Sequence, residues 1–274
     1  MADQILVAAV QMISTDDVQA NIRAAVAGVT QAAKRGAQLV VLPEYFCLLS
    51  PDDKAKSAIA EDYGDGPIQA ALSKLARETE VWLIGGTLPI KSVKGSEPDQ
   101  FDRVFNAQLV FAPDGEVLAR YDKIHLFNFN NGAESYNESR SVAAGREPQV
   151  VELPFAKVGL STCYDLRFPE LYRAMGEVDL IVVPAAFTQT TGRAHWEPLL
   201  RARAIENQAY VLAAAQGGEH PGARRTWGHS MLIDPWGEIM AEMELGAGVI
   251  VGELSLERIG TVRASLPALK NRVL

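Results

Sequence analysis

Short apolar runs of strand length recur along the chain, and they limit how it can fold. Four of them contain no charged residue: Ile5–Met12, Ala37–Pro43, Leu180–Pro184 and Tyr210–Ala215. A strand can be apolar throughout when both faces of its sheet are covered by other elements. The runs therefore predict buried sheets rather than sheets with one face in water.

The segment between the first two runs has the period of an amphipathic helix. Within Asp17–Arg35, apolar residues that include Val18, Ile22 and Val29 recur at three- and four-residue steps. Asp17 suits the N-cap and Gly36 suits the position just past the helix end. The resulting order of strand, helix and strand is the unit from which α/β proteins are built.

The rest of the chain continues this alternation and adds hairpins. Further helices are expected at Gly66–Ala76, Phe168–Met175, His195–Gln208 and Ser255–Arg263. Further strands are expected at Val81–Ile90, Val104–Phe111, Val117–Leu126, Val150–Leu153, Lys157–Cys163, His229–Asp234, Glu238–Met243 and Val249–Leu254. Hairpins mixed with helical connections indicate mixed sheets. No Pro/Gly/Ser-rich linker interrupts the pattern, so we expect one domain over residues 1–274, with long polar loops at Lys91–Gln100 and Asn128–Arg146.

Charge and composition exclude several classes of function. The chain has 34 acidic and 26 basic residues and a net charge of −8, which disfavours binding to nucleic acid or to an anionic membrane. Its two cysteines are too few for a disulfide framework, and its four scattered histidines do not indicate a metal site. No apolar run approaches the roughly 20 residues of a membrane-spanning helix. The N-terminus lacks a basic signal-peptide region, so we expect a cytoplasmic protein.

Cys163 has the most informative surroundings of any reactive residue. It ends the expected strand Lys157–Cys163 and directly precedes a turn into a helix. A side chain at such a turn projects into a cleft near backbone N–H groups, which favour a thiolate or an oxyanion. The arrangement resembles the nucleophile elbow of hydrolases with Cys in place of Ser. A buried core thiol is the alternative reading, and this context alone leaves both open.

Two other expected strands are followed by, or contain, a charged residue that can assist a thiol. Glu44 directly follows the strand Ala37–Pro43, and Lys123 lies within the strand Val117–Leu126. A buried lysine needs a carboxylate partner, so an interior Lys123 implies a nearby acid. Taken singly, Glu44 also fits a solvated strand end, and Lys123 an exposed edge strand.

Three segments resemble the signature segments of the nitrilase superfamily of carbon–nitrogen hydrolases. They are Leu42–Glu44, Tyr121–Leu126 and Gly159–Glu170, and they occur in the family's order. The resemblance extends from the first strand to about Leu266. It implies an α/β fold in the form of a four-layer α-β-β-α sandwich with two mixed sheets.

The resemblance also implies a Glu–Lys–Cys triad. Glu44 matches the general base, Lys123 the cationic stabiliser and Cys163 the nucleophile. Many members have a second active-site glutamate in the loop before the nucleophile strand. Glu138 matches that position best, and Glu134 in the same loop is the competing candidate. The family pattern implies no metal and no cofactor.

Segments in the second half point to a narrower group. Ala186–Glu197, Leu200–Gln208 and Gly228–Gly237 resemble the amidases that act on deaminated glutathione. This predicts hydrolysis of the primary amide of a keto acid, through a cysteine thioester, to a carboxylic acid and ammonia. An ω-amidase acting on 2-oxoglutaramate, a true nitrilase and a non-hydrolytic acyl transferase are the alternatives; the ω-amidases share the segment Lys123–Phe127.

A keto-acid amide is a small substrate that carries a carboxylate, so the site should contain a cation. Arg167, on the turn after Cys163, is the best-placed candidate, with a salt bridge to a neighbouring acid as its alternative role. The Tyr164 backbone N–H is expected to bind the oxyanion. Tyr45, Phe187 and Thr188 lie at expected strand ends that should face the pocket. The resemblance implies a homodimer or a higher homo-oligomer, and it leaves the role of Cys47 open.

Overall fold

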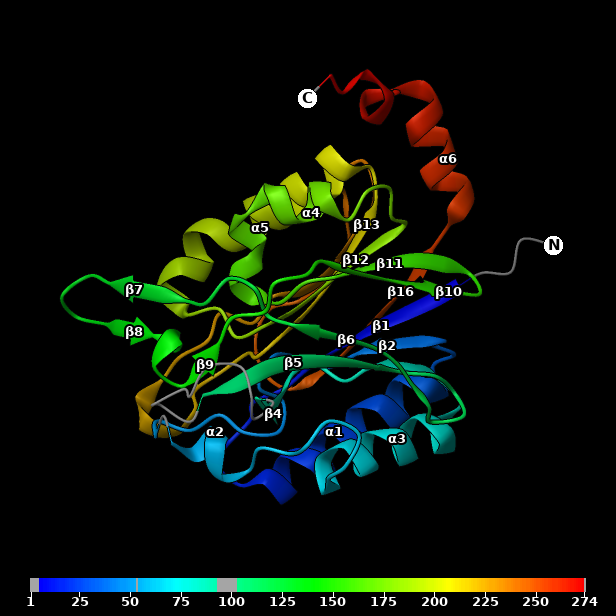
Figure 1. Ribbon diagram of the computed structural model, residues 1–274. Helices are drawn as coiled ribbons and strands as arrows, with labels where there is room; N and C mark the ends of the chain where they lie inside the picture. The colour runs from blue at the N-terminus through cyan, green and yellow to red at the C-terminus, as the bar shows by residue number, and fades with distance from the viewer. Residues whose placement is uncertain (1–4, 53, 93–102, 274) are drawn as a thin grey trace.

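The computed structural model describes residues 5–52, 54–92 and 103–273, and it shows two β-sheets packed face to face between helices (Figure 1). Helices α1 (Val18–Lys34) and α3 (Pro67–Thr79) cover the outer face of the first sheet. Helices α4 (Pro169–Ala174) and α5 (Gln189–Asn207) cover the outer face of the second. The four-layer α-β-β-α sandwich predicted from the sequence is confirmed.

The first sheet contains both parallel and antiparallel pairs. Its main path runs β16-β1-β2-β3-β5-β4, and β6 and β9 also pair with β5. Strand β1 is parallel to β2 and antiparallel to β16, which makes the sheet mixed as expected. The strands are β1 (Ile5–Gln11), β2 (Leu39–Val41), β3 (Trp82–Ile84), β4 (Leu88–Lys91), β5 (Val104–Phe111), β6 (Val117–Asp122), β9 (Val142–Ala143) and β16 (Gly248–Leu254).

The second sheet follows the order β10-β11-β12-β13-β14-β15 and is also mixed. Its centre is parallel, from β11 to β13, and its two edges are antiparallel hairpins. The strands are β10 (Gln149–Leu153), β11 (Ala156–Leu160), β12 (Leu180–Ala185), β13 (Tyr210–Ala215), β14 (Ser230–Ile233) and β15 (Ile239–Met243).

Apolar side chains fill each of the three spaces between the four layers. One cluster, which includes Val29 and Leu72, joins α1 and α3 to the first sheet. A second, which includes Val7 and Leu212, lies between the two sheets. The third joins the second sheet to α4 and α5 around Trp196. Because the strands are covered on both faces, their nearly continuous apolar sequences are explained.

Several expected boundaries shift for local reasons. The expected strand Val81–Ile90 is interrupted, because the backbone turns at Gly86 with φ of 58°. The helix predicted at His195–Gln208 starts earlier, at Gln189, because the Thr188 side chain caps it by accepting a hydrogen bond from the Thr191 N–H. The expected strand Lys157–Cys163 ends at Leu160.

The predicted polar loop 128–146 contains short elements rather than irregular chain alone. They are β7 (Asn128–Asn130), β8 (Ser135–Asn137), the 3-10 turn η1 (Glu138–Arg140) and β9. Most of the other expected loop, Lys91–Gln100, lies outside the described residues. The remaining elements are α2 (Ala55–Ala58), η2 (Cys163–Arg167), η3 (Pro221–Ala223), α6 (Leu256–Ser265) and η4 (Ala268–Asn271). Among the described ranges, no helix has the length and apolarity needed to cross a bilayer.

Candidate active site

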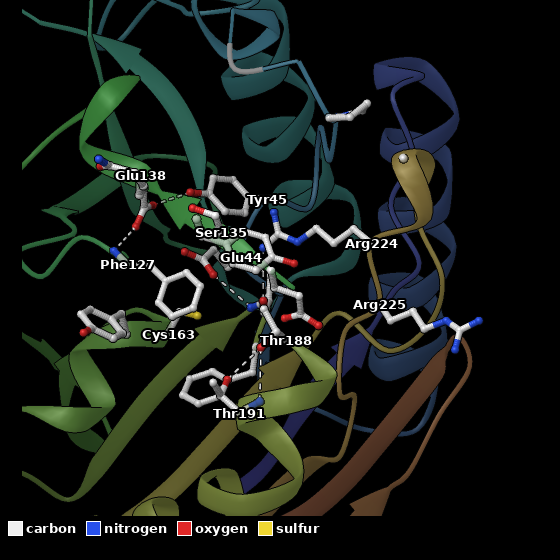
Figure 2. A pocket seen from close by; sticks show the side chains of 18 of the residues that line it. Glu44, Tyr45, Phe127, Ser135, Glu138, Cys163, Thr188, Thr191, Arg224 and Arg225 are labelled. Carbon is white, nitrogen blue, oxygen red and sulfur yellow. Dashed lines mark hydrogen bonds between the residues drawn. The ribbon is translucent and has the colours of Figure 1, made fainter. Parts of the chain in front are cut away.

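A cavity of about 780 Å³ opens where β2, β6 and β12 end, and the four residues expected to do chemistry line it (Figure 2). Glu44 follows β2, Lys123 follows β6, Glu138 begins η1 and Cys163 begins η2. The structure thus brings together side chains that are up to 119 positions apart, counting from 44 to 163. Within the described ranges, no three His, Cys, Asp or Glu side chains are grouped as metal ligands are.

The backbone around Glu44 is tightly constrained. Gly86 approaches the segment so closely that a Cβ atom at that position would lie 2.1 Å from the Pro43 carbonyl oxygen. Tyr45, directly after Glu44, has a positive φ of 56°, which is costly for a bulky residue. Its N–H donates a hydrogen bond to the Thr87 hydroxyl at 2.9 Å. This turn holds the Glu44 side chain at the base of the cavity.

Lys123 connects the two glutamates of the site. Its Nζ lies 2.8 Å from Glu44 Oε1 and 2.7 Å from Glu138 Oε2. The Lys123 and Glu44 side chains are 1% exposed and that of Glu138 is 6% exposed. Gly145 permits this packing, because a Cβ there would lie 2.0 Å from the carbonyl oxygen of Asp122, the residue before Lys123. The structure therefore brings Glu138, and not Glu134, to the lysine.

The charges of this cluster stabilise one another. Burial by itself lowers the pKa of the Lys123 ammonium, but the carboxylates of Glu138 and Glu44 reverse that effect and raise the pKa above its usual value. Burial raises the pKa of Glu138, but the charges of Lys123 and Lys56 and the hydrogen bonds from Lys123 and the Phe127 N–H together outweigh it and bring the pKa to about 2. Lys123 is therefore a permanent cation at neutral pH and Glu138 a permanent anion.

Neutral donors complete the bonding of both carboxylates. Asn106 Nδ2 donates to Glu44 Oε1 at 3.0 Å and to Glu138 Oε1 at 3.3 Å. Glu44 Oε2 accepts the Ala186 N–H at 3.0 Å. Glu138 accepts the Phe127 N–H at 2.7 Å and also the Tyr45 hydroxyl. Sequence reasoning missed Asn106; the signal for it was a polar amide within the apolar strand Val104–Phe111, since a buried amide requires partners.

Cys163 occupies a strained position between strand and helix. Its φ is 51°, in the left-handed region that non-glycine residues seldom adopt. The sequence predicted that the strand continues to Cys163, but β11 ends at Leu160 and Cys163 is the first residue of η2. The side chain is 7% exposed and lines the cavity, so it is not a thiol sealed in the core.

Asp165, two residues after Cys163, fixes this turn to the segment that carries Lys123, which directly follows β6 and does not lie within the strand as the sequence predicted. It accepts the Thr162 N–H at 2.8 Å, the Tyr121 hydroxyl at 2.6 Å and the His125 N–H at 3.0 Å. Tyr121 and His125 lie two residues before and two residues after Lys123. One buried carboxylate thus sets the position of the thiol relative to the ammonium.

The thiol is held in its protonated form at rest. Burial raises the pKa of Cys163 well above its usual value; the negative charge of Glu44 adds to this, and Lys123 acts in the opposite direction. The Glu44 carboxylate and the thiol line the same cavity. A carboxylate in this position can accept the thiol proton when an electrophile arrives.

The residues expected to bind substrate also line the cavity. Tyr164 and Arg167 belong to η2, Tyr45 lies beside Glu44, and Phe187 and Thr188 follow β12. The Arg167 guanidinium lies over the rings of Tyr164 at 5.6 Å and Phe187 at 5.3 Å. It contacts His195 Nδ1 at 3.2 Å and forms no salt bridge with Asp165 or Glu170, the alternative role considered for it.

The structure also places Glu134 and Cys47, whose roles the sequence left undecided. Glu134 lies at the cavity wall and accepts a hydrogen bond from the Thr190 hydroxyl at 2.9 Å. Cys47 packs in the core between the first sheet and its helices, 1% exposed. Burial raises the pKa of its thiol to about 12. It does not line the cavity that contains Cys163.

Two further cavity residues, Lys56 and Arg224, were not anticipated. The Lys56 Nζ lies 4.7 Å from the centre of the Tyr45 ring, and its charge lowers the pKa of Glu138. Arg224 follows η3 and extends over the Tyr136 ring at 5.5 Å. Neither residue belongs to an apolar strand or to a recognisable motif, so the sequence carried no signal for them.

Comparison with known proteins agrees with this arrangement. The family model described as carbon–nitrogen hydrolase matches residues 6–264. A protein from Synechocystis sp. named deaminated glutathione amidase is 40% identical over 98% of both chains. The mouse protein named omega-amidase NIT2 is 35% identical over 92% of this chain and 89% of its own. The structure of Saccharomyces cerevisiae Nit3, a member of the nitrilase superfamily, superposes with a TM-score of 0.86 at 30% identity over 99% of this chain and 97% of that one. This chain belongs to the carbon–nitrogen hydrolase family.

Proposed function

We propose that the chain is an amidase in which Cys163 is the nucleophile, Glu44 the general base and Lys123 the oxyanion stabiliser. The observation that carries the proposal is the convergence of these three side chains in one cavity, where Lys123 Nζ lies 2.8 Å from Glu44 Oε1 and the charge of the same carboxylate raises the pKa of the Cys163 thiol. Glu138 is a positioning residue, since it holds the ammonium at 2.7 Å.

In the first half of the reaction, Glu44 accepts the thiol proton as the sulfur attacks the amide carbonyl carbon. The negative charge that develops on the carbonyl oxygen is stabilised by the Lys123 ammonium and the Tyr164 N–H. Glu44 then returns the proton to the amide nitrogen as the C–N bond breaks, because an amide anion is too basic to leave unaided. A thioester on Cys163 remains.

In the second half, Glu44 removes a proton from a water molecule that attacks the thioester. The tetrahedral intermediate is stabilised by the same two donors and collapses to a carboxylic acid as the C–S bond breaks. Glu44 gives the proton that it took from water to the departing Cys163 sulfur, which restores the thiol and the Glu44 carboxylate. Lys123 keeps its charge throughout, because its raised pKa prevents it from giving up a proton.

For the substrate, we propose an amide of 2-oxoglutaric acid, with deaminated glutathione favoured. This follows the names of the relatives at 40% and 38% identity. Arg167 is placed to bind the keto-acid carboxylate, since its guanidinium faces the cavity without an acidic partner among the described residues. In deaminated glutathione the amide nitrogen belongs to cysteinylglycine, so the amide is secondary and the leaving group is that amine. This corrects the expectation of a primary amide and ammonia for this substrate; in 2-oxoglutaramate the amide is primary and the leaving group is ammonia.

The relative named omega-amidase makes hydrolysis of 2-oxoglutaramate the second candidate. Both substrates release 2-oxoglutarate, and they differ in what leaves. The experiment measures the release of 2-oxoglutarate from each, and of ammonia from a simple nitrile. We expect the largest kcat/KM for deaminated glutathione. A larger value for the nitrile contradicts the proposal.

Cys163→Ala tests the mechanism, with Cys47→Ala as a matched control. We expect Cys163→Ala to abolish product release, because no other nucleophile is placed in the proposed mechanism. We expect Cys47→Ala to retain it, because that thiol lies outside the cavity. Full activity of Cys163→Ala would show that the nucleophile is misassigned.

A further inference from the structure

Two buried polar atoms in the wall of the cavity have no hydrogen-bond partner among the described residues. They are Nε of Arg224, a donor, and Oε2 of Glu134, an acceptor. Both residues line the cavity. A buried polar atom without a partner costs free energy, so each of these atoms is an open position for a ligand.

Arg224 and Arg225 both line the cavity, but their side chains extend in different directions. Figure 2 shows its side chain extending toward Tyr45 and Ser135, while the Arg225 side chain extends the other way. The Arg224 Nη2 reaches the Ala186 carbonyl oxygen at 3.4 Å, next to the groups that bind Glu44. Arg225 is 62% exposed and pairs with Glu219 at 3.6 Å.

Glu134 reaches the same part of the wall from the turn between β7 and β8. Its Oε1 is held by the Thr190 hydroxyl at 2.9 Å, which leaves Oε2 for another donor. Both charges act on Tyr136. Burial raises the pKa of Tyr136, the Arg224 charge lowers it and the Glu134 charge raises it. A donor and an acceptor therefore line the cavity within electrostatic reach of one tyrosine.

Arg224 offers a donor and Glu134 an acceptor, and only one end of the proposed substrate has groups that match both. The keto-acid end of a 2-oxoglutaric amide offers acceptors alone: a ketone oxygen and a carboxylate. A peptide-like leaving group offers both a peptide N–H, which suits Glu134, and a terminal carboxylate, which suits Arg224. Arg167 reaches the cavity from η2, and Arg224 reaches it from the segment after η3. The two cations can therefore serve two carboxylates.

We propose that Arg224 and Glu134 form a subsite for the leaving-group portion of the substrate, a short peptide amine with a free carboxylate. The inference rests on the proposed function and deepens it. It makes the site selective for an amide whose nitrogen carries a peptide, over an amide that releases ammonia.

The test compares Arg224→Gln with Arg225→Gln on two substrates. For Arg224→Gln, we expect the KM for deaminated glutathione to rise about tenfold or more, because a charge-assisted hydrogen bond is lost. The KM for 2-oxoglutaramate should stay within about twofold, since that substrate lacks the bound portion. Its kcat also reports that the variant is folded. Arg225→Gln should behave as wild type with both substrates.

Product inhibition gives a second readout. Cysteinylglycine should inhibit the wild-type enzyme competitively, and Arg224→Gln and Glu134→Gln should each weaken that inhibition. An equal rise of both KM values in Arg224→Gln overturns the inference, since Arg224 would then bind the shared keto-acid end. An unchanged KM for deaminated glutathione overturns it as well. Failure of the wild type to hydrolyse deaminated glutathione overturns the proposed substrate, and the subsite with it.

Discussion

The floor and the rim of the cavity differ in how completely their polar groups are bonded. The floor, which we define as Glu44, Lys123, Glu138 and Asn106, is a closed network in which the ammonium contacts both carboxylates at 2.7–2.8 Å. The rim, which we define as Arg167, Arg224, Glu134 and Thr190, contains two buried atoms with no partner among the described residues. The first network is complete without a ligand, and the second is not.

This difference separates the two tasks of the site. Groups that stabilise charge in a transition state are effective when they are already in position, because no reorganisation is needed at the moment of reaction. Groups that recognise a substrate need free donors and acceptors. Two residues next to the floor, Tyr45 and Cys163, have positive φ. The Tyr45 N–H is bonded to the Thr87 hydroxyl, and the turn at Cys163 is held by the bond from the Thr162 N–H to Asp165.

Lys123→Met changes the floor and should cause a larger loss of stability and activity than any of the other variants. It removes the one cation that contacts both buried carboxylates and leaves Glu44 and Glu138 to repel each other. We expect the free energy of unfolding to fall by about 3–5 kcal/mol and product release to be lost. Urea denaturation of the variant beside wild type measures the first effect.

Arg167→Met is the matched control on the rim. This side chain has no acidic partner among the described residues, so its loss should change the free energy of unfolding by about 1 kcal/mol or less. Arg167→Met should instead raise the KM, because Arg167 is proposed to bind the keto-acid carboxylate. Equal destabilisation by the two variants would show that floor and rim do not differ as described.

Asp165→Asn should lower the free energy of unfolding by an intermediate amount. It tests whether Asp165 sets the position of the Cys163 thiol relative to the floor. Loss of the charge weakens the bonds to Thr162, Tyr121 and His125, so we expect a loss of roughly 2 kcal/mol in the free energy of unfolding. Because the thiol then moves relative to Lys123, kcat should fall about tenfold or more with little change in KM.

Asp234→Asn controls for a merely structural effect. Asp234 is also a buried carboxylate, 4% exposed, that accepts the Trp236 and Glu238 N–H groups and pairs with Arg258. It does not line the cavity. The Asp234→Asn variant should lose a similar amount of its free energy of unfolding as Asp165→Asn, with no change in kcat. If both variants reduce kcat equally, Asp165 is not a positioning residue.

The floor and the layers were largely predictable from the sequence, because they depend on local pattern and motif. Apolar runs identified most strands, and Asp17 and Gly36 set the ends of α1 closely. Glu44 and Lys123 stand at the ends of such strands. The early start of α5 at Gln189 was missed, since a Thr188 cap outweighed the weak apolar pattern of the first turn.

The rim was predictable only in part: the sequence pointed to Arg167 and named Glu134 as a candidate for a different role, but it gave no signal for Arg224. Arg224 lies on a segment with no periodic pattern of apolar residues. Its role depends on the direction of its side chain, which differs from that of Arg225. The sequence does not show this difference between two neighbouring arginines. Asp165 lies within the segment Gly159–Glu170, yet its bonds to Tyr121 and His125 span about 40 residues of chain and are not visible in that segment. Such contacts follow from tertiary packing rather than from local pattern.

Thr190→Val should have the smallest effect and tests the rim alone. The Thr190 hydroxyl holds Glu134 Oε1 at 2.9 Å in an exposed position, so its loss should change the free energy of unfolding by about 0.5 kcal/mol or less. Glu134 then loses its fixed orientation, and the KM for deaminated glutathione should rise by about two- to fivefold, whereas the KM for 2-oxoglutaramate should not change. Steady-state kinetics with both substrates, beside urea denaturation, measures the two effects. A loss of stability comparable to that of Asp165→Asn would mean that the rim, like the floor, is part of the folded framework, and the contrast between a bonded floor and an open rim would not hold.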